Sequence, residues 1–451
     1  MSNGGATTSP IPSPAPSTDA SLIASLQALD RDGRTLFVLR SLRMFGYGFL
    51  AIVLVLYLAA SGLDPLTIGI VLTLTLVGDT VVSLWLTTHA DRVGRRRVLV
   101  LGSALVVLAG AAFAGTDVVP ILIIAGIVGV ISPTGNEVGP FLAVEQAALT
   151  QIVADRRRTA VFAWYNLVGY VATATGGLTA GLVSQGLLDS GTREVDAYRA
   201  IVIGYAAIGL VMAAVATRLG PSIEARTAGR SGPSDDGVRR RLGLGRSRGI
   251  VLRLSALFSL DAFAGGFIPQ SLMAYWFHLR FGVDPAVLGA IFFAANLLAA
   301  VSALSAARIA ARIGLIETMV VTHLPSNVLL IMVPLMPSLE LAVAVLLLRY
   351  SLSQMDVPTR QSYVMAVVEP DERSAAAGVT GIARTIGASV SPSVSSVLVA
   401  NAGLAAVPFF LAGGLKIVYD LLLYRDFRTS RRLAEPYEVA ISRPTEPPAA
   451  A

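Results

Sequence analysis

The chain has 451 residues, of which 54% are hydrophobic and only 14% are charged, with a formal net charge of +6. A soluble domain carries about 25% charged residues, so this composition excludes a soluble globular protein and predicts a chain that crosses a membrane several times. The chain has no cysteine, which excludes disulfides and thiolate metal sites. The positive charge lies between hydrophobic runs, a pattern that indicates membrane topology and argues against a nucleic-acid partner.

The first half of the chain contains six apolar runs behind a polar tail. Residues 1–33 begin with a tract rich in Ser, Thr, Pro and Gly and lack the apolar core of a signal peptide, so we expect a disordered tail with a short surface helix near its end. Runs of about 20 apolar residues are long enough to span a bilayer. They lie at about 37–60, 66–90, 98–115, 118–150, 159–187 and 199–219.

A second set of six runs follows a polar stretch. Residues 220–249 are rich in Gly, Ser and Arg and show no apolar period, which is typical of a flexible linker. The later runs lie at about 250–279, 285–311, 315–337, 340–367, 374–400 and 404–424, before a polar tail at 425–451. The sequence therefore predicts an all-α membrane protein with twelve transmembrane helices in two pseudo-symmetric six-helix bundles, residues 34–219 and 250–424.

The arginines indicate the orientation of these helices. They are concentrated in the two terminal segments, in the linker and in alternate loops, while the opposite loops hold only Arg193, Arg199 and Arg280. Because positively charged loops are retained in the cytoplasm, we expect a multi-pass protein of the cell membrane with both termini in the cytoplasm.

The two halves share short sequence patterns, as the repeats of transporters often do. The stretch 62–65, Gly-Leu-Asp-Pro, follows the first run and recurs as Gly-Val-Asp-Pro at 282–285, after the seventh. When the later parts of the two halves are aligned with each other without gaps, Glu145 of the first half corresponds to Arg360 of the second. The chain is therefore expected to contain a structural repeat.

The loop between the second and third runs carries the most recognisable motif. It contains Asp91, Arg92, Gly94, Arg95 and Arg96, and it resembles the Asp-Arg-x-Gly-Arg-Arg signature of major facilitator superfamily transporters. With the six-plus-six plan, the resemblance covers essentially the whole chain and implies that superfamily's fold and a gating role for this loop. The loop departs from the pattern at Thr87, where the family has Gly, and the second-half loop 307–314 has no acid.

Two physical interpretations of this loop stay open. The aspartate can accept hydrogen bonds from the N-terminus of a neighbouring helix, and the arginines can pair with acids or lipid phosphates in one gate state only. Alternatively, the charges only set the topology.

Acidic residues inside the runs are candidates for proton coupling. Each charge at the centre of a span costs about 2.5–3.5 kcal/mol on insertion scales, so such residues are usually functional or paired. The candidates are Asp261, beside two glycines in the seventh run, Asp79 in the second and Glu137 in the fourth. Asp261 could instead be a partner for an arginine such as Arg384, and Asp79 could be hydrogen-bonded in helix packing.

Charges in the fourth and tenth runs are candidates for the cavity and its gate. Arg349, Ser353, Asp356 and Arg360 fall on one helical stripe of the tenth run. The resemblance assigns this run, with the first, fourth and seventh, to a central cavity, and Arg384 is a further candidate charge. Prolines and glycines interrupt the fourth run before Glu145, as expected where a substrate or ion binds. Glu145 and Arg360 could face each other as an inner gate pair, or they could form a fixed structural pair.

Uncharged polar groups inside the runs are candidates for substrate contact. These are Asn136, Gln270, Tyr275, His323 and Gln354. Most such groups only join helices, at about 0.6 kcal/mol each, and a lone histidine is more often structural. Lys416 and Asp420, spaced i, i+4 in the last run, are expected to neutralise each other.

Motifs for other chemistry are not found in the sequence. There is no GxxxxGK[ST] phosphate loop, no HExxH and no nucleophile elbow, so we expect neither an enzyme nor a cofactor or metal. The predicted function is secondary active transport of a small polar or organic solute by alternating access, coupled to protons. The alternatives are multidrug or metabolite efflux, a membrane sensor that keeps the fold, and, less favoured, a channel. The expected partners are the lipid bilayer, a small-molecule substrate and a coupling proton, with no nucleic acid, and the expected state is a monomer.

Overall fold

The computed structural model describes residues 29–137, 140–224, 245–369 and 372–427, and every regular element in these ranges is a helix. This confirms the predicted all-α fold class. Residues 1–28, 225–244 and 428–451 lie outside the described residues. For these residues the disordered tail, the surface helix and the flexible linker stay predictions. At the described ends of the predicted linker, Pro221–Ile223 form a 3-10 turn and a helix begins at Arg248.

The helices follow the predicted runs in chain order. The first half consists of α2 (Arg31–Ala60), α3 (Pro65–Val93), α4 (Arg95–Gly115), α5 (Val119–Val128), α6 (Phe141–Ile152), α7 (Asp155–Asp189), α8 (Glu194–Ala216) and the 3-10 turn η1 (Pro221–Ile223). The second half consists of α9 (Arg248–Gly266), α10 (Gln270–Phe281), α11 (Pro285–Ile313), α12 (Leu315–Met332), η2 (Val333–Leu335), α13 (Leu339–Ser353), α14 (Asp356–Val367), α15 (Arg373–Ala400) and α16 (Val407–Phe427). Within the described residues, ten helical stretches are long and apolar enough to cross a membrane.

Three of the predicted runs are divided into two helices each, and prolines explain two of these breaks. A proline removes one backbone N–H, and its ring clashes with the carbonyl four residues earlier in a helix. Pro269 lies between α9 and α10. Pro358 lies in the first turn of α14. In an unbroken helix its ring would clash with the carbonyl of Gln354. The helix is interrupted at Gln354, and this clash is avoided. The third break, between α5 and α6, falls where prolines and glycines predicted an interruption.

One expectation about the tenth run is wrong in detail. Arg349 and Ser353 belong to α13, whereas Asp356 and Arg360 belong to α14, so they do not lie on one continuous helical stripe. All four side chains nevertheless line the same cavity. The helix is broken between these residues, but their side chains still face the cavity.

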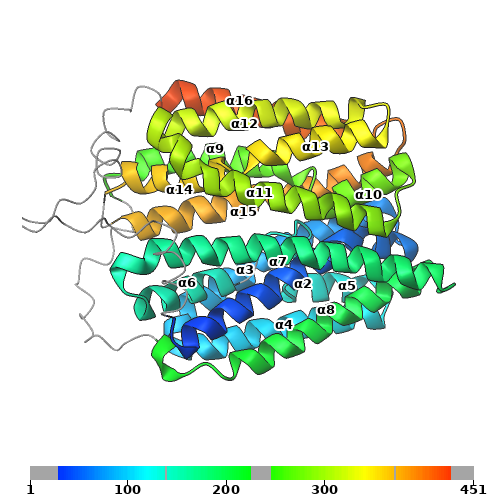
Figure 1. Cartoon of the computed structure of the whole chain (residues 1–451), viewed down its shortest axis with the longest axis horizontal. Coiled ribbons are helices and arrows are strands. Elements are labelled where there is room, and N and C mark those ends of the chain that lie inside the picture. Colours follow the sequence, from blue (N-terminus) through cyan, green and yellow to red (C-terminus); the bar gives the residue numbers. More distant parts are fainter. Residues whose placement is uncertain (1–28, 138–139, 225–244, 370–371, 428–451) are drawn as a thin grey trace, which may run out of the picture.

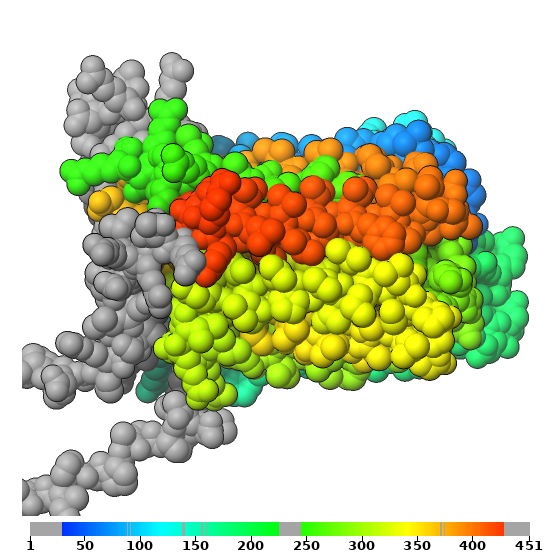
Figure 2. Space-filling model, turned by 90° about the horizontal axis from the view of Figure 1, so that it is seen from above, coloured from blue at the N-terminus to red at the C-terminus, as the bar shows by residue number. Residues whose placement is uncertain are grey.

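The two halves lie side by side, with α2 to α8 on one side and α9 to α16 on the other (Figure 1). The helix α2 begins and α16 ends at the same end of the molecule, which we name the terminal face; the opposite end is the far face (Figure 1). Figure 2 shows α16 in red beside the yellow region of α12 and α13, which run together between these faces. Between the halves, the main contacts join α7 to α11 and α3 to α15.

Close packing near the far face joins the halves. A Cβ atom added to Gly69 of α3 would lie 2.6 Å from Cα of Ser393 on α15, and one added to Gly181 of α7 would lie 3.0 Å from Cα of Gly289 on α11. Both positions therefore require glycine, because the backbones touch. The N–H of Ser271 also donates to the carbonyl of Pro133 across the halves, at 3.1 Å.

The sequence repeat has a structural counterpart. Gly62 and Gly282 adopt positive φ values of 84° and 66° before α3 and α11, a conformation that favours glycine. Gly94 and Gly314, with φ values of 105° and 96°, end the same two helices. Asp64 caps α3 by accepting hydrogen bonds from the two N–H groups of Leu66 and Thr67.

Candidate functional site

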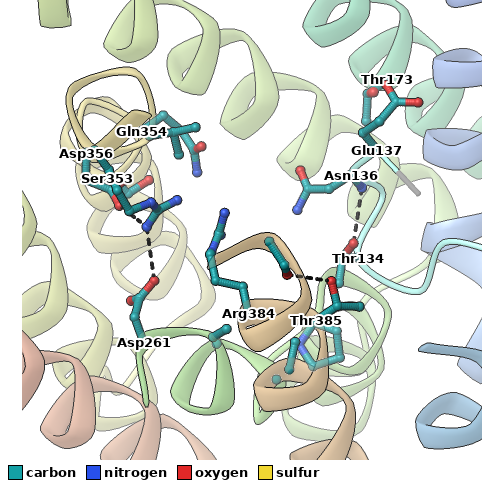
Figure 3. A pocket seen from close by; sticks show the side chains of 18 of the residues that line it. Thr134, Asn136, Glu137, Thr173, Asp261, Ser353, Gln354, Asp356, Arg384 and Thr385 are labelled. Atoms are coloured by element: carbon teal, nitrogen blue, oxygen red, sulfur yellow. Dashed lines mark hydrogen bonds and ion pairs between the residues drawn. The ribbon is translucent and has the colours of Figure 1, made fainter. Parts of the chain in front are cut away.

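A cavity of about 570 Å³ lies between the two halves, and its lining comes from both (Figure 3). The first half contributes side chains from α2, α3, α6, α7 and the segment between α5 and α6, and the second contributes side chains from α9 and α11 to α16. A second hollow of about 330 Å³ shares Asp79, Glu137 and Thr385 with the cavity and continues between α3 and α15 toward the terminal face. The cavity is thus closed by helix packing near the far face and extends toward the terminal face.

A cluster of charges from the first half holds α2 against α6 and α7. The Arg43 guanidinium donates to both oxygens of Glu145, at 2.5 and 2.9 Å, and the hydroxyl of Tyr165 donates to the same carboxylate. Arg43 is 1% exposed and Glu145 is 0% exposed. Arg43 also donates to Glu137 at 2.7 Å, and Arg40 forms an ion pair with Glu137. The sequence identified the acids but not these partners on the first helix.

A second network surrounds Asp261 on α9. Lys416 donates to one of its oxygens at 2.5 Å, and Arg360 donates to the other at 3.3 Å. His323 Nε2 lies 3.9 Å from the oxygen that Lys416 contacts. Arg360 also donates to Asp356, one helical turn earlier on α14, at 2.9 Å. Three helices distant in the sequence therefore meet at one carboxylate beside the cavity.

The same network continues behind His323 into the protein. Its Nδ1 lies 2.8 Å from an oxygen of Asp420, and the Asn327 amide donates to the other oxygen at 2.9 Å. Asp420 is 0% exposed. The expectation that Lys416 and Asp420 neutralise each other is therefore wrong, because each finds a closer partner on a neighbouring helix.

The expected pair between Glu145 and Arg360 is also corrected. Each is paired inside its own half, Glu145 with Arg43 and Arg360 with Asp356 and Asp261. Packing of α6 against α2 brings Arg43 to Glu145. Arg360 lines the cavity, whereas Glu145 does not.

Arg349 and Arg384 differ from the other cavity cations. Among the described residues, neither has a carboxylate within ion-pair distance, and the Nε atom of each is buried without a hydrogen-bond partner. The Arg349 guanidinium lies over the ring of Tyr350, 5.1 Å from its centroid. Figure 3 shows Arg384 extending from α15 into the pocket. The expected pairing of Asp261 with Arg384 is not formed, because Lys416 and Arg360 occupy that carboxylate.

The remaining polar candidates divide into those that face the cavity and those that do not. Asn136, His323 and Gln354 line it. Gln270 lines a smaller adjoining hollow, where it accepts a hydrogen bond from Asn296 at 3.3 Å. Tyr275 lines neither hollow and packs against the hydrophobic core, so its substrate contact stays a prediction.

The acidic candidates for coupling all border the cavity. Asp79 on α3 lines both hollows and accepts a hydrogen bond from the hydroxyl of Ser83 at 3.1 Å. Glu137 and Asp261 line the cavity from opposite halves, each within a network of cations.

The arginine-rich loop lies on the terminal face, away from the cavity. The N–H groups of Arg95 and Arg96, in the first turn of α4, donate to the carboxylate of Glu224 at 2.7 and 3.3 Å. The Arg96 side chain donates to the carbonyl of Thr217 at 2.5 Å, and that of Arg95 donates to the carbonyl of Ile223 at 3.1 Å.

Glu224, an acid in the predicted linker 220–249, therefore binds the N-terminus of α4, the kind of role expected of Asp91. The side chain of Asp91 lies outside the described residues, and that of Arg92 is exposed. Gly94 supplies the positive φ between α3 and α4. The gating role of this loop stays a prediction.

The chain is similar to known proteins in its sequence and in its fold. The family model described as Major Facilitator Superfamily matches residues 36–392. An uncharacterized membrane protein of Saccharomyces cerevisiae is 28% identical over 427 residues, covering 89% of this chain and 95% of that protein.

Three solved structures of transporters have a similar fold. A nucleoside transporter, NupG, has a TM-score of 0.68 at 15% identity and covers 88% of this chain and 99% of its own. A D-xylose-proton symporter has a TM-score of 0.67 at 14% identity, covering 87% and 97%. The human organic anion transporter MFSD10 has a TM-score of 0.57 at 18% identity, covering 87% and 99%. At these identities the likeness shows a shared fold.

Proposed function

The chain belongs to the Major Facilitator Superfamily, and on this premise we propose that it is a secondary transporter that moves a small polar organic solute across the membrane by alternating access. The observation that carries the proposal is the central cavity. Its volume of about 570 Å³ falls in the range of about 300–1,000 Å³ that is usual for small-molecule sites. Both halves line it, so any movement of one half against the other changes access to it.

The packing between the halves supports alternating access. Near the far face, glycines at Gly69, Gly181 and Gly289 let the helices of the two halves touch. Toward the terminal face, α3 and α15 border a hollow that is continuous with the cavity. This arrangement fits a state open to the terminal face, and separating the glycine contacts would open the other side.

The network around Asp261 supports coupling to a proton. Protonation of this carboxylate would remove the charge that attracts Lys416 and Arg360, two cations that line the cavity from α16 and α14. His323 connects it to the buried carboxylate of Asp420. Loading a proton would thus change the electrostatics at the solute site, and the solute and the proton would influence each other's binding.

The orientation and the assembly belong to the same proposal. The arginines of the loop 92–97 lie on the terminal face, and the positive-inside rule places such loops in the cytoplasm. We therefore propose a cell-membrane protein whose terminal face is cytoplasmic. We also propose a monomeric transporting unit, because the cavity lies between the two halves of one chain.

Transport by the purified protein in proteoliposomes tests the proposal. Radiolabelled sugars, nucleosides, amino acids and organic acids are screened with and without an imposed pH gradient. We expect saturable uptake of at least one class, accelerated by the gradient. Equal flux in protein-free liposomes for every class would refute transport.

The coupling role of Asp261 has its own pair of variants. Asp261→Asn should abolish the response to the pH gradient, while Asp189→Asn, at an exposed carboxylate on the far end of α7, should keep it. A full response in Asp261→Asn would remove Asp261 from the coupling role and leave facilitated transport intact.

A further inference from the structure

The charges that line the cavity are unbalanced. The cations are Arg40, Arg349, Arg360, Arg384 and Lys416, and the carboxylates are Asp79, Glu137, Asp261 and Asp356. Cations therefore outnumber carboxylates, before any contribution from His323. A cavity with this lining favours a solute that brings negative charge.

Ion pairing concentrates the unbalanced charge in one place. Arg40 is paired with Glu137, Lys416 with Asp261, and Arg360 with both Asp356 and Asp261. Arg349 and Arg384 remain, and neither has a carboxylate partner among the described residues. Both belong to the second half, on α13 and α15.

The placement of two such groups beside the cavity needs a physical reason. A guanidinium stays protonated in proteins, and a charge that is partly removed from water without an opposite charge beside it is destabilising. Arg349 and Arg384 each bury their Nε without a hydrogen-bond partner, while their side chains border the cavity. A bound anion would supply both the missing charge and the missing acceptors.

The chemistry of the guanidinium group defines the class of ligand. Its planar fork of N–H donors matches the paired oxygens of a carboxylate or a phosphate. Gln354 and Ser353, at the break between α13 and α14, border the cavity and could donate further hydrogen bonds. In Figure 3, Arg384 lies between the Asp261 and Asp356 side of the pocket and Asn136 on the first half.

We propose that Arg349 and Arg384 form an anion-binding subsite and that the transported solute is an organic anion with a carboxylate or phosphate group. This inference rests on the proposed transport function and specifies its substrate class. The anionic end binds to the second half, and the polar remainder faces the first half. The first-half groups available to it are Thr134, Asn136, Asn166 and Tyr170.

Modification by phenylglyoxal, which reacts with accessible guanidinium groups, tests the subsite on the full chain. Mass spectrometry of peptides follows the rate at Arg349 and Arg384, with exposed Arg280 as the internal control. The probes are matched pairs at millimolar concentration: benzoate against benzamide, and glucose 6-phosphate against glucose, with inorganic phosphate alone. We expect anions to slow modification at the two cavity arginines several-fold, while neutral counterparts and the rate at Arg280 show no effect. The two pairs also distinguish a carboxylate from a phosphate preference.

Variants of Arg384 and Arg280 test whether the protection of Arg349 depends on the second cavity arginine. In Arg384→Gln, the anion concentration that half-protects Arg349 should rise at least tenfold; Arg384→Lys, which keeps the charge but not the fork, should show a smaller rise. Arg280→Gln should behave as the wild type, and thermal unfolding of each variant verifies its fold. Protection by none of the anions, or equal protection by their neutral counterparts, would overturn the proposal.

The two proposals can fail separately. Gradient-driven uptake of neutral solutes alone, unaffected by Arg384→Gln, would sink the anion subsite and leave the transport function standing. Anion protection at Arg349 and Arg384 without flux of any solute would support the subsite and contradict transport.

Discussion

Substituting Gly181 by valine should shift the protein away from the state described here. Gly181 on α7 faces α11 of the other half, and an added Cβ atom would lie 3.0 Å from Cα of Gly289 and 3.1 Å from the carbonyl carbon of Pro285. Carbon atoms normally keep about 3.5–4.0 Å apart, so the two backbones must separate by roughly 0.5–1 Å. Overpacking of this kind costs about 1–3 kcal/mol. Because the clash joins the two halves, opening the far face relieves it.

A cost of about 1–3 kcal/mol on one of two states changes their ratio by roughly 5- to 150-fold. The chain has no cysteine, so a single Gln354→Cys places the only thiol in the cavity. Labelling by a membrane-impermeant maleimide on intact cells then reports access from the far face under the proposed orientation. We expect Gly181→Val to speed labelling several-fold or more.

Two glycines on the same helix provide the controls. A Cβ atom at Gly186 would meet nothing within 4 Å, so Gly186→Val should leave the labelling rate unchanged. At Gly176 it would lie 2.9 Å from the backbone nitrogen of Phe49, inside the first half, so Gly176→Val should lower thermal stability without favouring either state. The reasoning fails if Gly181→Val leaves far-face labelling unchanged, or if Gly186→Val raises it equally.

Further predictions concern two carboxylates outside the cavity lining, the buried Glu145 and Glu372, which binds the N–H groups before α9. Arg43→Gln leaves Glu145 buried without its main partner and should cost about 3–5 kcal/mol; thermal unfolding should show less than additive loss in the double variant with Glu145→Gln, and strict additivity would contradict the pairing. Glu372 accepts hydrogen bonds from the N–H groups before α9, and the N–H of Ser247 lowers the pKa of its carboxyl below the ordinary 4.5. Its stabilisation should therefore be complete above pH 4.5 and be lost as the pH falls through the lower folded pKa. The unfolding temperatures of the wild type and Glu372→Gln should converge on acidification, and a constant difference would refute this role.

Much of the architecture follows from local features of the sequence. The length of an apolar run determines whether a helix can span a bilayer, and that criterion located the spanning helices. The prolines also mark two of the breaks, because a missing N–H and a ring clash act within four residues. Gly94 and Gly314 end the equivalent helices α3 and α11, and their positive φ is again a property of the local backbone.

The partners of the buried charges could not be predicted in the same way. Spacing suggested that Lys416 pairs with Asp420 on one helix, yet Lys416 contacts Asp261 on α9 and Asp420 contacts His323 on α12. An i, i+4 pair on a helix is worth only about 0.2–0.5 kcal/mol. Neighbouring helices offer closer and better-directed partners, but only the packing of α9, α12 and α16 decides which ones meet. Arg43 is the partner of Glu145 for the same reason, because only the packing of α2 against α6 brings the two side chains together.

The division of charges between the halves has a consequence for mechanism. In the first half, Arg43, Glu145 and Tyr165 bond to one another outside the cavity lining, so their contacts need not change when a solute or proton binds. In the second half, Asp261 borders the cavity and is held by groups from three other helices. A change of charge there must reorganise several helices at once. Under the proposed coupling, we therefore expect a change of charge at Asp261 to alter the packing of the second half, whereas the first-half cluster reaches the cavity through Glu137, which Arg43 contacts.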